Sequence, residues 1–151
     1  MRLELSGGVV IASTLREVWQ SLLDPRFVAG SAPGVESVEV LDSTHFRVIS
    51  GIGLGPIRSK LKLHGELLNI VPGSSATMRI RGKGAGSEIQ VLTSIAVQDA
   101  GPEGGVRLRW SAVSELSGMV VKAGPRLIDG VARKFTEQFW EDFARRVETR
   151  R

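Results

Sequence analysis

Hydrophobic and polar positions alternate along the chain with two different periods. Over residues 15–23, apolar side chains recur at every third or fourth position, which predicts a short amphipathic helix. Thr14 followed by Glu17 fits a capping box at the start of this helix, with Ser13 as a rival N-cap. The Asp-Pro pair at residues 24–25 predicts a second short helix, because aspartate favours the N-cap and proline the first helical position.

From Val35 to Ser117 the period is two, which is typical of strands with one apolar and one polar face. Short turns rich in glycine, proline and serine divide this region into six strands. The stretch from Leu3 to Ala12 predicts a seventh strand, with a bulge at the Gly7–Gly8 pair. Because consecutive strands are joined by short turns, the pattern favours an antiparallel meander.

The last segment, roughly Gly118 to Thr149, returns to the helical period, with a break expected near residues 124–125 (Gly-Pro). A sheet with one apolar face needs a cover, and only this helix is long enough to supply it. Small residues occupy the first half of the helix and phenylalanines the second. We therefore expect the second half to pack tightly on the sheet and the first half to border a pocket. The apolar stripe consists of Leu127, Val131, Phe135, Phe139 and Phe143.

This order of elements, with several motifs, resembles the START/Bet v 1-like helix-grip superfamily. Within it, the chain is similar to the CoxG family, the G-subunits of carbon monoxide dehydrogenase, over about residues 3–143. The resemblance implies an α+β helix-grip fold in one domain, residues 1–151. A curved antiparallel seven-stranded sheet would wrap round a long C-terminal helix, with two short helices after the first strand. The motifs are DPRFVAGSAPG at 24–34, GLGPI at 53–57, GKGAG at 82–86 and GPRLIDGVARKFTEQF at 124–139.

The resemblance also implies a cavity for a hydrophobic ligand and a non-catalytic accessory role. CoxG-like proteins are associated with molybdenum-containing carbon monoxide dehydrogenases and with their attachment to the membrane. We expect no built-in cofactor, a bound quinone or lipid, and a molybdenum hydroxylase complex as partner. Two alternatives stay open: an enzyme of the polyketide cyclase type on the same fold, and a pure protein-interaction module with a filled core.

The cavity candidates are apolar or small residues from several predicted elements. Each of them can equally fill a core, since a strand register that slips by one residue exchanges the two faces. Trp110 carries an indole N–H that needs a partner if it is buried, and a ligand carbonyl is one candidate. The candidates are Phe27, Ile52, Leu54, Leu63, Met78, Ile80, Trp110, Met119, Ala123, Leu127 and Val131.

The residue composition excludes several kinds of catalytic and metal-binding site. The chain has no cysteine, which excludes disulfides, zinc–thiolate sites and a cysteine nucleophile. His45 and His64 have no second ligand at metal spacing, so we predict no metal site and two ordinary surface histidines. The glycines at 82–86 lack the spacing of a phosphate loop, and no serine lies in a nucleophile elbow. Hence we predict no catalytic residues.

The charged residues point to a solvated surface. The net charge is +4, and the basic positions of the predicted polar face have no aromatic residues between them, so we expect no nucleic acid partner. Asp129 fits ion pairs with Arg126 and Arg133 on one helix face. The arginine-rich segment 145–151 fits a frayed, soluble helix end or a weak contact for anionic lipid.

Location and assembly follow from what the sequence lacks. No apolar run reaches the roughly 18 residues of a membrane span, and no signal peptide is recognisable. Several members of the family carry a further C-terminal linker and apolar tail, and this sequence has none. We therefore expect at most transient contact with the inner membrane face. We expect a cytoplasmic monomer or homodimer. The excess of arginine over lysine leans toward a heat-adapted source.

Overall fold

A computed structural model describes residues 1–54, 57–84, 86–101 and 104–150, with the backbone alone at residues 52–54 and 57–59. In chain order, the elements are β1 (Arg2–Ile11), α1 (Leu15–Leu22), α2 (Pro25–Gly30), β2 (Val35–Val40), β3 (His45–Leu54), β4 (Ile57–Val71), β5 (Ser75–Gly84), β6 (Ser87–Asp99), β7 (Val106–Gly118), the 3₁₀ helix η1 (Met119–Ala123) and α3 (Pro125–Thr149).

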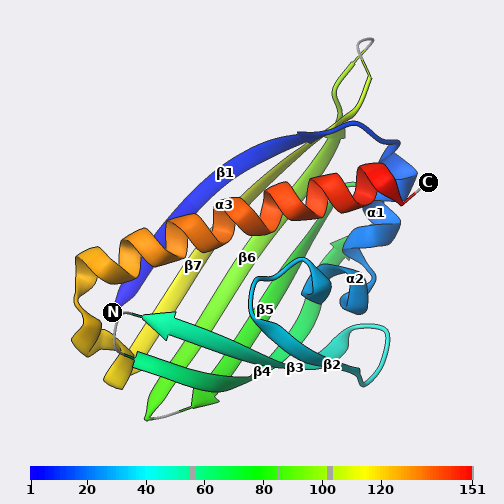
Figure 1. Cartoon of the computed structure of the whole chain (residues 1–151). Helices are drawn as coiled ribbons and strands as arrows, with labels where there is room; N and C mark the ends of the chain where they lie inside the picture. The colour runs from blue at the N-terminus through cyan, green and yellow to red at the C-terminus, as the bar shows by residue number, and fades with distance from the viewer. Residues whose placement is uncertain (55–56, 85, 102–103, 151) are drawn as a thin grey trace.

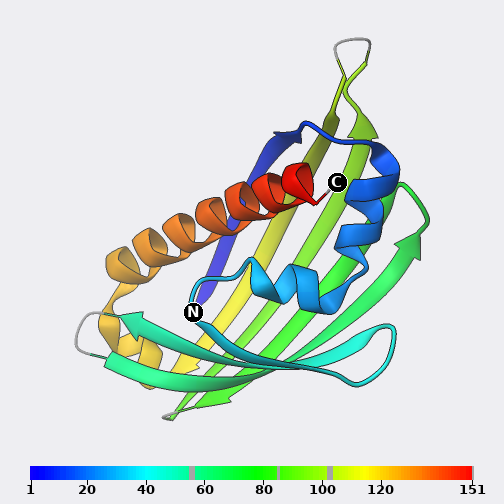
Figure 2. The same cartoon turned by 45° about the vertical axis from the view of Figure 1, so that its right-hand side comes forward.

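All seven strands form one antiparallel sheet in the order β1-β7-β6-β5-β4-β3-β2. Apart from β1, each strand pairs with its neighbour in the chain, so the predicted meander is confirmed. Figure 1 shows α3 lying along the concave side near β1 and β7, with α1 and α2 at its C-terminal end. The turned view shows β2, β3 and β4 curling round from the opposite edge (Figure 2). The expected helix-grip architecture is confirmed.

Local sequence signals set the two short helices. Thr14 is the N-cap of α1, and its hydroxyl accepts a hydrogen bond from the backbone N–H of Glu17 at 3.2 Å. The Ser13 hydroxyl donates a hydrogen bond to the Glu17 carboxylate, but Ser13 is not the N-cap. Asp24 is the N-cap of α2, with Pro25 at the first helical position, as the sequence predicts.

The C-terminal helical segment is interrupted where the sequence expects it. Gly124 has φ +94°, in the left-handed region that favours glycine, and it separates η1 from α3. Pro125 then occupies the first helical position of α3, where its missing N–H leaves no helical bond unmade. The predicted break is confirmed, and α3 proper has 25 residues.

The main core lies between α1, α3 and the strands β1, β6 and β7. Ile11, Val18, Val106, Leu108 and Phe143 have no exposed surface. A second, smaller cluster joins Leu116, Val120 and Ile128 at the N-terminal end of α3. The core therefore fixes both ends of α3 to the β1–β7 side of the sheet. Across the described residues, no helix combines the length and the apolar character of a membrane span.

The predicted bulge at Gly7–Gly8 is wrong. The β1–β7 register runs without a shift from Arg2 opposite Glu115 to Ile11 opposite Val106. Gly7 serves a packing purpose instead, because a Cβ built on it would lie 2.9 Å from the indole ring of Trp110.

Candidate functional site

The concave face of the sheet is apolar and is not completely covered. Inward positions on β4 and β5 alternate with charged outward positions, as the sequence predicts. Three predicted cavity residues, Leu63, Met78 and Ile80, lie on this inward side in one cluster with Phe46 and Val48. All three are only half-buried, although they lie in the middle of the sheet. Met78 also packs against the main core, and part of each of the three side chains stays exposed.

The helix that crosses this face also leaves apolar surface free. Phe135 lies one turn after Val131, which packs on the second cluster, and one turn before Phe139, which packs on the main core. Its side chain therefore shares their sheet-facing stripe, yet it is 43% exposed. The expectation that the whole second half of the helix packs tightly is wrong at this residue. Phe135 therefore leaves apolar surface of the helix open to solvent.

Five apolar residues stay partly exposed, three on the inward side of the sheet and two on the apolar stripe of α3, and we call them the open apolar face. It comprises Leu63, Met78, Ile80, Val131 and Phe135. Among the described inward strand positions from Phe46 to Leu116, the only ionisable side chain is Asp99, at the end of β6. The open apolar face therefore offers burial and shape rather than proton transfer.

The other predicted cavity residues lie elsewhere. Phe27 packs edge-to-face on Phe143, with ring centroids 5.6 Å apart, in the main core. Trp110 is in the main core as well, with 7% of its surface exposed. The side chains of Ile52 and Leu54 lie outside the described residues.

Three candidates gather round the N-terminal end of α3. Ala123 packs with the second cluster, while Met119 and Leu127 are exposed. Met119 lies beside Gly86, where an added Cβ would approach its side chain to 3.0 Å. These residues extend apolar surface from the end of α3 toward the β5–β6 hairpin.

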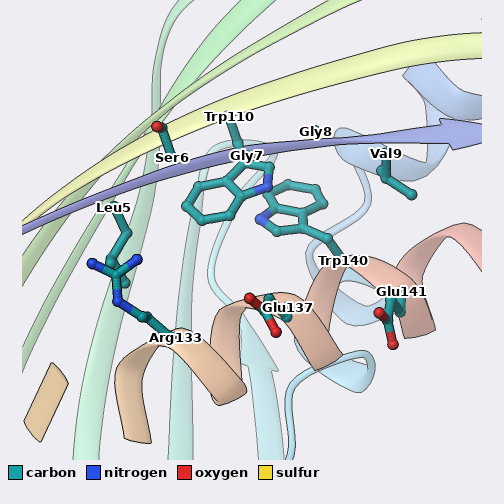
Figure 3. A pocket seen from close by; sticks show the side chains of 10 residues that line it. All are labelled: Leu5, Ser6, Gly7, Gly8, Val9, Trp110, Arg133, Glu137, Trp140 and Glu141. Atoms are coloured by element: carbon teal, nitrogen blue, oxygen red, sulfur yellow. The ribbon is translucent and has the colours of Figure 1, made fainter. Parts of the chain in front are cut away.

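A separate cleft of about 300 Å³ lies between β1 and α3 (Figure 3). It opens beside the edge strand, where the Gly7–Gly8 pair leaves no side-chain wall. Two indoles form its inner wall, with ring centroids 6.3 Å apart and planes 19° apart. The lining residues are 5–9 of β1, Trp110 of β7, and Arg133, Glu137, Trp140 and Glu141 of α3.

Sequence reasoning misses Phe135, Glu137 and Trp140 as site residues. The apolar stripe of α3 is recognisable in the sequence, but which members stay uncovered depends on how the sheet curls. One usable signal for the cleft is the Gly7–Gly8 pair, which the strand pattern alone interprets as a bulge. A glycine opposite a tryptophan on the neighbouring strand can also leave that ring uncovered, because glycine has no side chain.

The outer face of the sheet carries a cluster of titratable groups round His45. His45 Nδ1 lies 2.9 Å from Asp42 Oδ1, and its Nε2 lies 3.0 Å from Glu66 Oε2. Hydrogen bonds that the ring donates to the carboxylate of Asp42, and then to that of Glu66, raise the pKa of His45 above its ordinary value of 6.5. The backbone N–H of Thr44, followed by His45, lowers the pKa of Asp42 to about 2. His45 is thus at the surface but is not a free side chain.

The described residues hold no group of three or more His, Asp or Glu side chains placed to bind a metal ion. Asp129 pairs with Arg133 at 2.8 Å, as the helical spacing predicts, and raises the pKa of the guanidinium, whereas no ion pair with Arg126 is found among the described residues. This ion pair holds Arg133 at the rim of the cleft.

The arginines at the C-terminal end of α3 are not a frayed surface. Arg146 donates hydrogen bonds of 2.6 Å to the Phe27 carbonyl and to the Ser31 hydroxyl. Its guanidinium carbon also lies 4.2 Å from the centre of the Phe27 ring, and that of Arg150 lies 4.6 Å from the same centre. The soluble-end interpretation is wrong for these two residues, because they join α2 to α3.

Comparisons with known proteins agree with this geometry. A conserved protein from Geobacillus kaustophilus has a TM-score of 0.87, with 21% identity over 96% of this chain and 95% of the other. A START superfamily protein from Mycobacterium smegmatis has a TM-score of 0.75, with 12% identity over 98% and 99%. The Zhui aromatase/cyclase from Streptomyces sp. R1128 has a TM-score of 0.69, with 13% identity over 99% and 96%. At these identities the likeness shows the fold.

Sequence comparison decides the family. No functionally curated protein is significantly similar to the chain. The CoxG family, the G-subunits of carbon monoxide dehydrogenase, matches residues 7–148, nearly the whole chain. The sequence motifs, the helix-grip architecture and this match agree, and the chain belongs to the CoxG family.

Proposed function

We propose that this protein binds a hydrophobic small molecule, of the quinone or lipid class, against the open apolar face. In this proposal it is a non-catalytic accessory protein that assists the membrane docking or the electron-acceptor supply of a molybdenum-containing carbon monoxide dehydrogenase. Family membership supports the accessory role. It acts in the cytoplasm, with at most transient contact at the inner membrane face.

The observation that carries the proposal is the exposure of Phe135. A phenylalanine on the sheet-facing stripe of a long helix is normally covered, because burying it is worth about 1.5–3 kcal/mol. Here 43% of it remains exposed, and inward residues of β4 and β5 on the same concave side of the sheet are themselves only half-buried. An apolar ligand that covers both surfaces removes them from water.

The alternative is an enzyme of the polyketide cyclase type. The fold is shared with an aromatase/cyclase, but the likeness is at 13% identity. A cyclase needs polar groups that converge on its substrate. The inward strand positions of the described chain are mostly apolar or small, which favours ligand binding over acid–base chemistry.

The test is isothermal titration calorimetry of the protein with decylubiquinone and, separately, with oleate. We expect Phe135→Ser to raise the Kd about tenfold, the equivalent of losing roughly 1.4 kcal/mol of apolar contact. The matched control is Leu92→Ser, because Leu92 is 41% exposed but points outward from β6. Equal binding by the two variants would place the ligand elsewhere, and failure of both compounds to bind the wild type would remove the proposal.

A further inference from the structure

The β1–α3 cleft holds polar groups that the protein itself does not satisfy. Trp110 and Trp140 are 7% and 5% exposed, so both are more than nine-tenths buried. Within the described residues, neither indole N–H makes a hydrogen bond, and each indole nitrogen keeps some exposed surface. Both indoles line the cleft (Figure 3). The cleft therefore has two donors at its inner wall that are open to an acceptor atom of a ligand.

The rim of the cleft carries hydrogen-bond acceptors, two carboxylates, in place of donors. Glu137 and Glu141 lie one helical turn apart on α3 and line the same opening. No ion pair to either carboxylate is found in the described part of the chain. Arg133 lines the same cleft and is attracted to Glu137, but its guanidinium pairs with Asp129 at 2.8 Å. Two like charges so placed repel each other, and a ligand cation relieves that repulsion.

The walls between these groups are apolar and open. Leu5 and Val9 on the inward side of β1 line the cleft, and Gly7 between them contributes no side chain. A volume of about 300 Å³ lies at the lower end of the range for small-molecule sites. The indole rings add surfaces that attract both aromatic rings and organic cations.

We propose that the β1–α3 cleft binds a small aromatic amine whose ring also carries an oxygen acceptor. The oxygen accepts from the indole N–H groups of Trp110 and Trp140. The ring packs against Leu5, Val9 and the open backbone at Gly7, and the protonated amine pairs with the carboxylates at the rim. This site is distinct from the open apolar face, and the proposal does not depend on the proposed function.

The probe is tyramine, which has a phenolic oxygen and a protonated amine on one ring. The chain has three tryptophans, so a ¹⁵N-labelled sample gives three indole N–H signals, assigned by single Trp→Phe variants. We expect tyramine to shift the signals of Trp110 and Trp140 downfield while Trp19, on α1, stays in place. No shift at millimolar tyramine, or equal shifts of all three signals, would overturn the proposal.

Two analogues and three variants test the assigned chemistry. 4-Ethylphenol lacks the amine and phenethylamine lacks the oxygen, and we expect each to bind at least about tenfold more weakly than tyramine. Glu137→Gln with Glu141→Gln weakens tyramine binding by a similar factor, whereas the control pair Glu39→Gln and Glu115→Gln, on exposed positions away from the cleft, does not. Tyramine affinity unchanged in the first pair, or matched by 4-ethylphenol, contradicts the role of the carboxylates. Phe135→Ser leaves tyramine binding intact, which separates this site from the open apolar face.

Discussion

At the scale of single residues, the outer face of the sheet has a pH-dependent contact. His45 bridges Asp42 and Glu66, and Glu66 also pairs with Arg79 at 3.2 Å. Because the pKa of His45 is raised in the folded protein, its stabilisation is complete below the ordinary value of 6.5. This stabilisation is lost as the pH rises through the pKa that His45 has in the folded protein. The contribution of Asp42 has the opposite sign and is lost only as the pH falls toward about 2.

This predicts that His45→Gln destabilises the protein more at about pH 5.5 than at about pH 9. Denaturant midpoints of the wild type and the variant at the two pH values measure the difference. Arg47→Gln on the same strand is the control, and its effect should be the same at both values. A His45→Gln effect that grows with pH would contradict the assigned ion pairs.

Gly65 predicts a steric effect at one residue. It is buried on β4 opposite Phe46, and a Cβ on it would overlap the Phe46 ring. We expect Gly65→Ala to lower the free energy of unfolding by about 1–3 kcal/mol, as overpacking does. Gly51→Ala is the control, since a Cβ there has its nearest neighbour at 3.8 Å. Equal stability of the two variants in chemical denaturation would show that Phe46 moves freely.

At the scale of elements, α3 is not optimised for helix stability. Gly130 lies within it, has no positive φ, and a Cβ there would meet nothing within 4 Å. Gly130→Ala should therefore raise the free energy of unfolding by roughly 0.5–1 kcal/mol. Gly124→Ala should lower it, because Gly124 has φ +94°. Thermal unfolding of both variants checks the pair, and a loss at Gly130 would imply a role for its backbone.

The connection between α2 and α3 depends on one arginine. Arg146 is half-buried and makes two hydrogen bonds across this interface. We expect Arg146→Met to cost about 1.5–3 kcal/mol, the range for hydrogen bonds to charged groups. Arg145→Met, at an exposed ion pair with Asp142, should cost less than about 1 kcal/mol. Comparable losses in urea denaturation would mean that the Arg146 contacts are dispensable.

Elements are predictable from the sequence where local physics decides them. The caps at Thr14 and Asp24, the break before Pro125 and the period-two strands follow from neighbouring residues. The role of Gly7 does not, because it is set by Trp110, more than one hundred positions away in the chain. Such long-range packing has no local signal.

At the scale of the whole molecule, the candidate site is only partly predictable. Alternation correctly assigns Leu63, Met78 and Ile80 to one inward face. Their exposure depends on how far α3 lies from the β2–β5 side of the curled sheet, which is a property of the complete fold (Figure 2). For that reason the sequence predicts a packed Phe135, and it places Trp110 at the main pocket although this residue lines a different cleft.

The central claim is that an apolar ligand covers the open apolar face. The most direct measurement is native mass spectrometry of the protein purified from its own host, with organic extraction of whatever is bound. The account predicts a quinone or a lipid at near-stoichiometric occupancy, reduced in the Phe135→Ser variant but not in Leu92→Ser. A mass equal to that of the bare chain, unchanged when quinones and fatty acids are added, would contradict it.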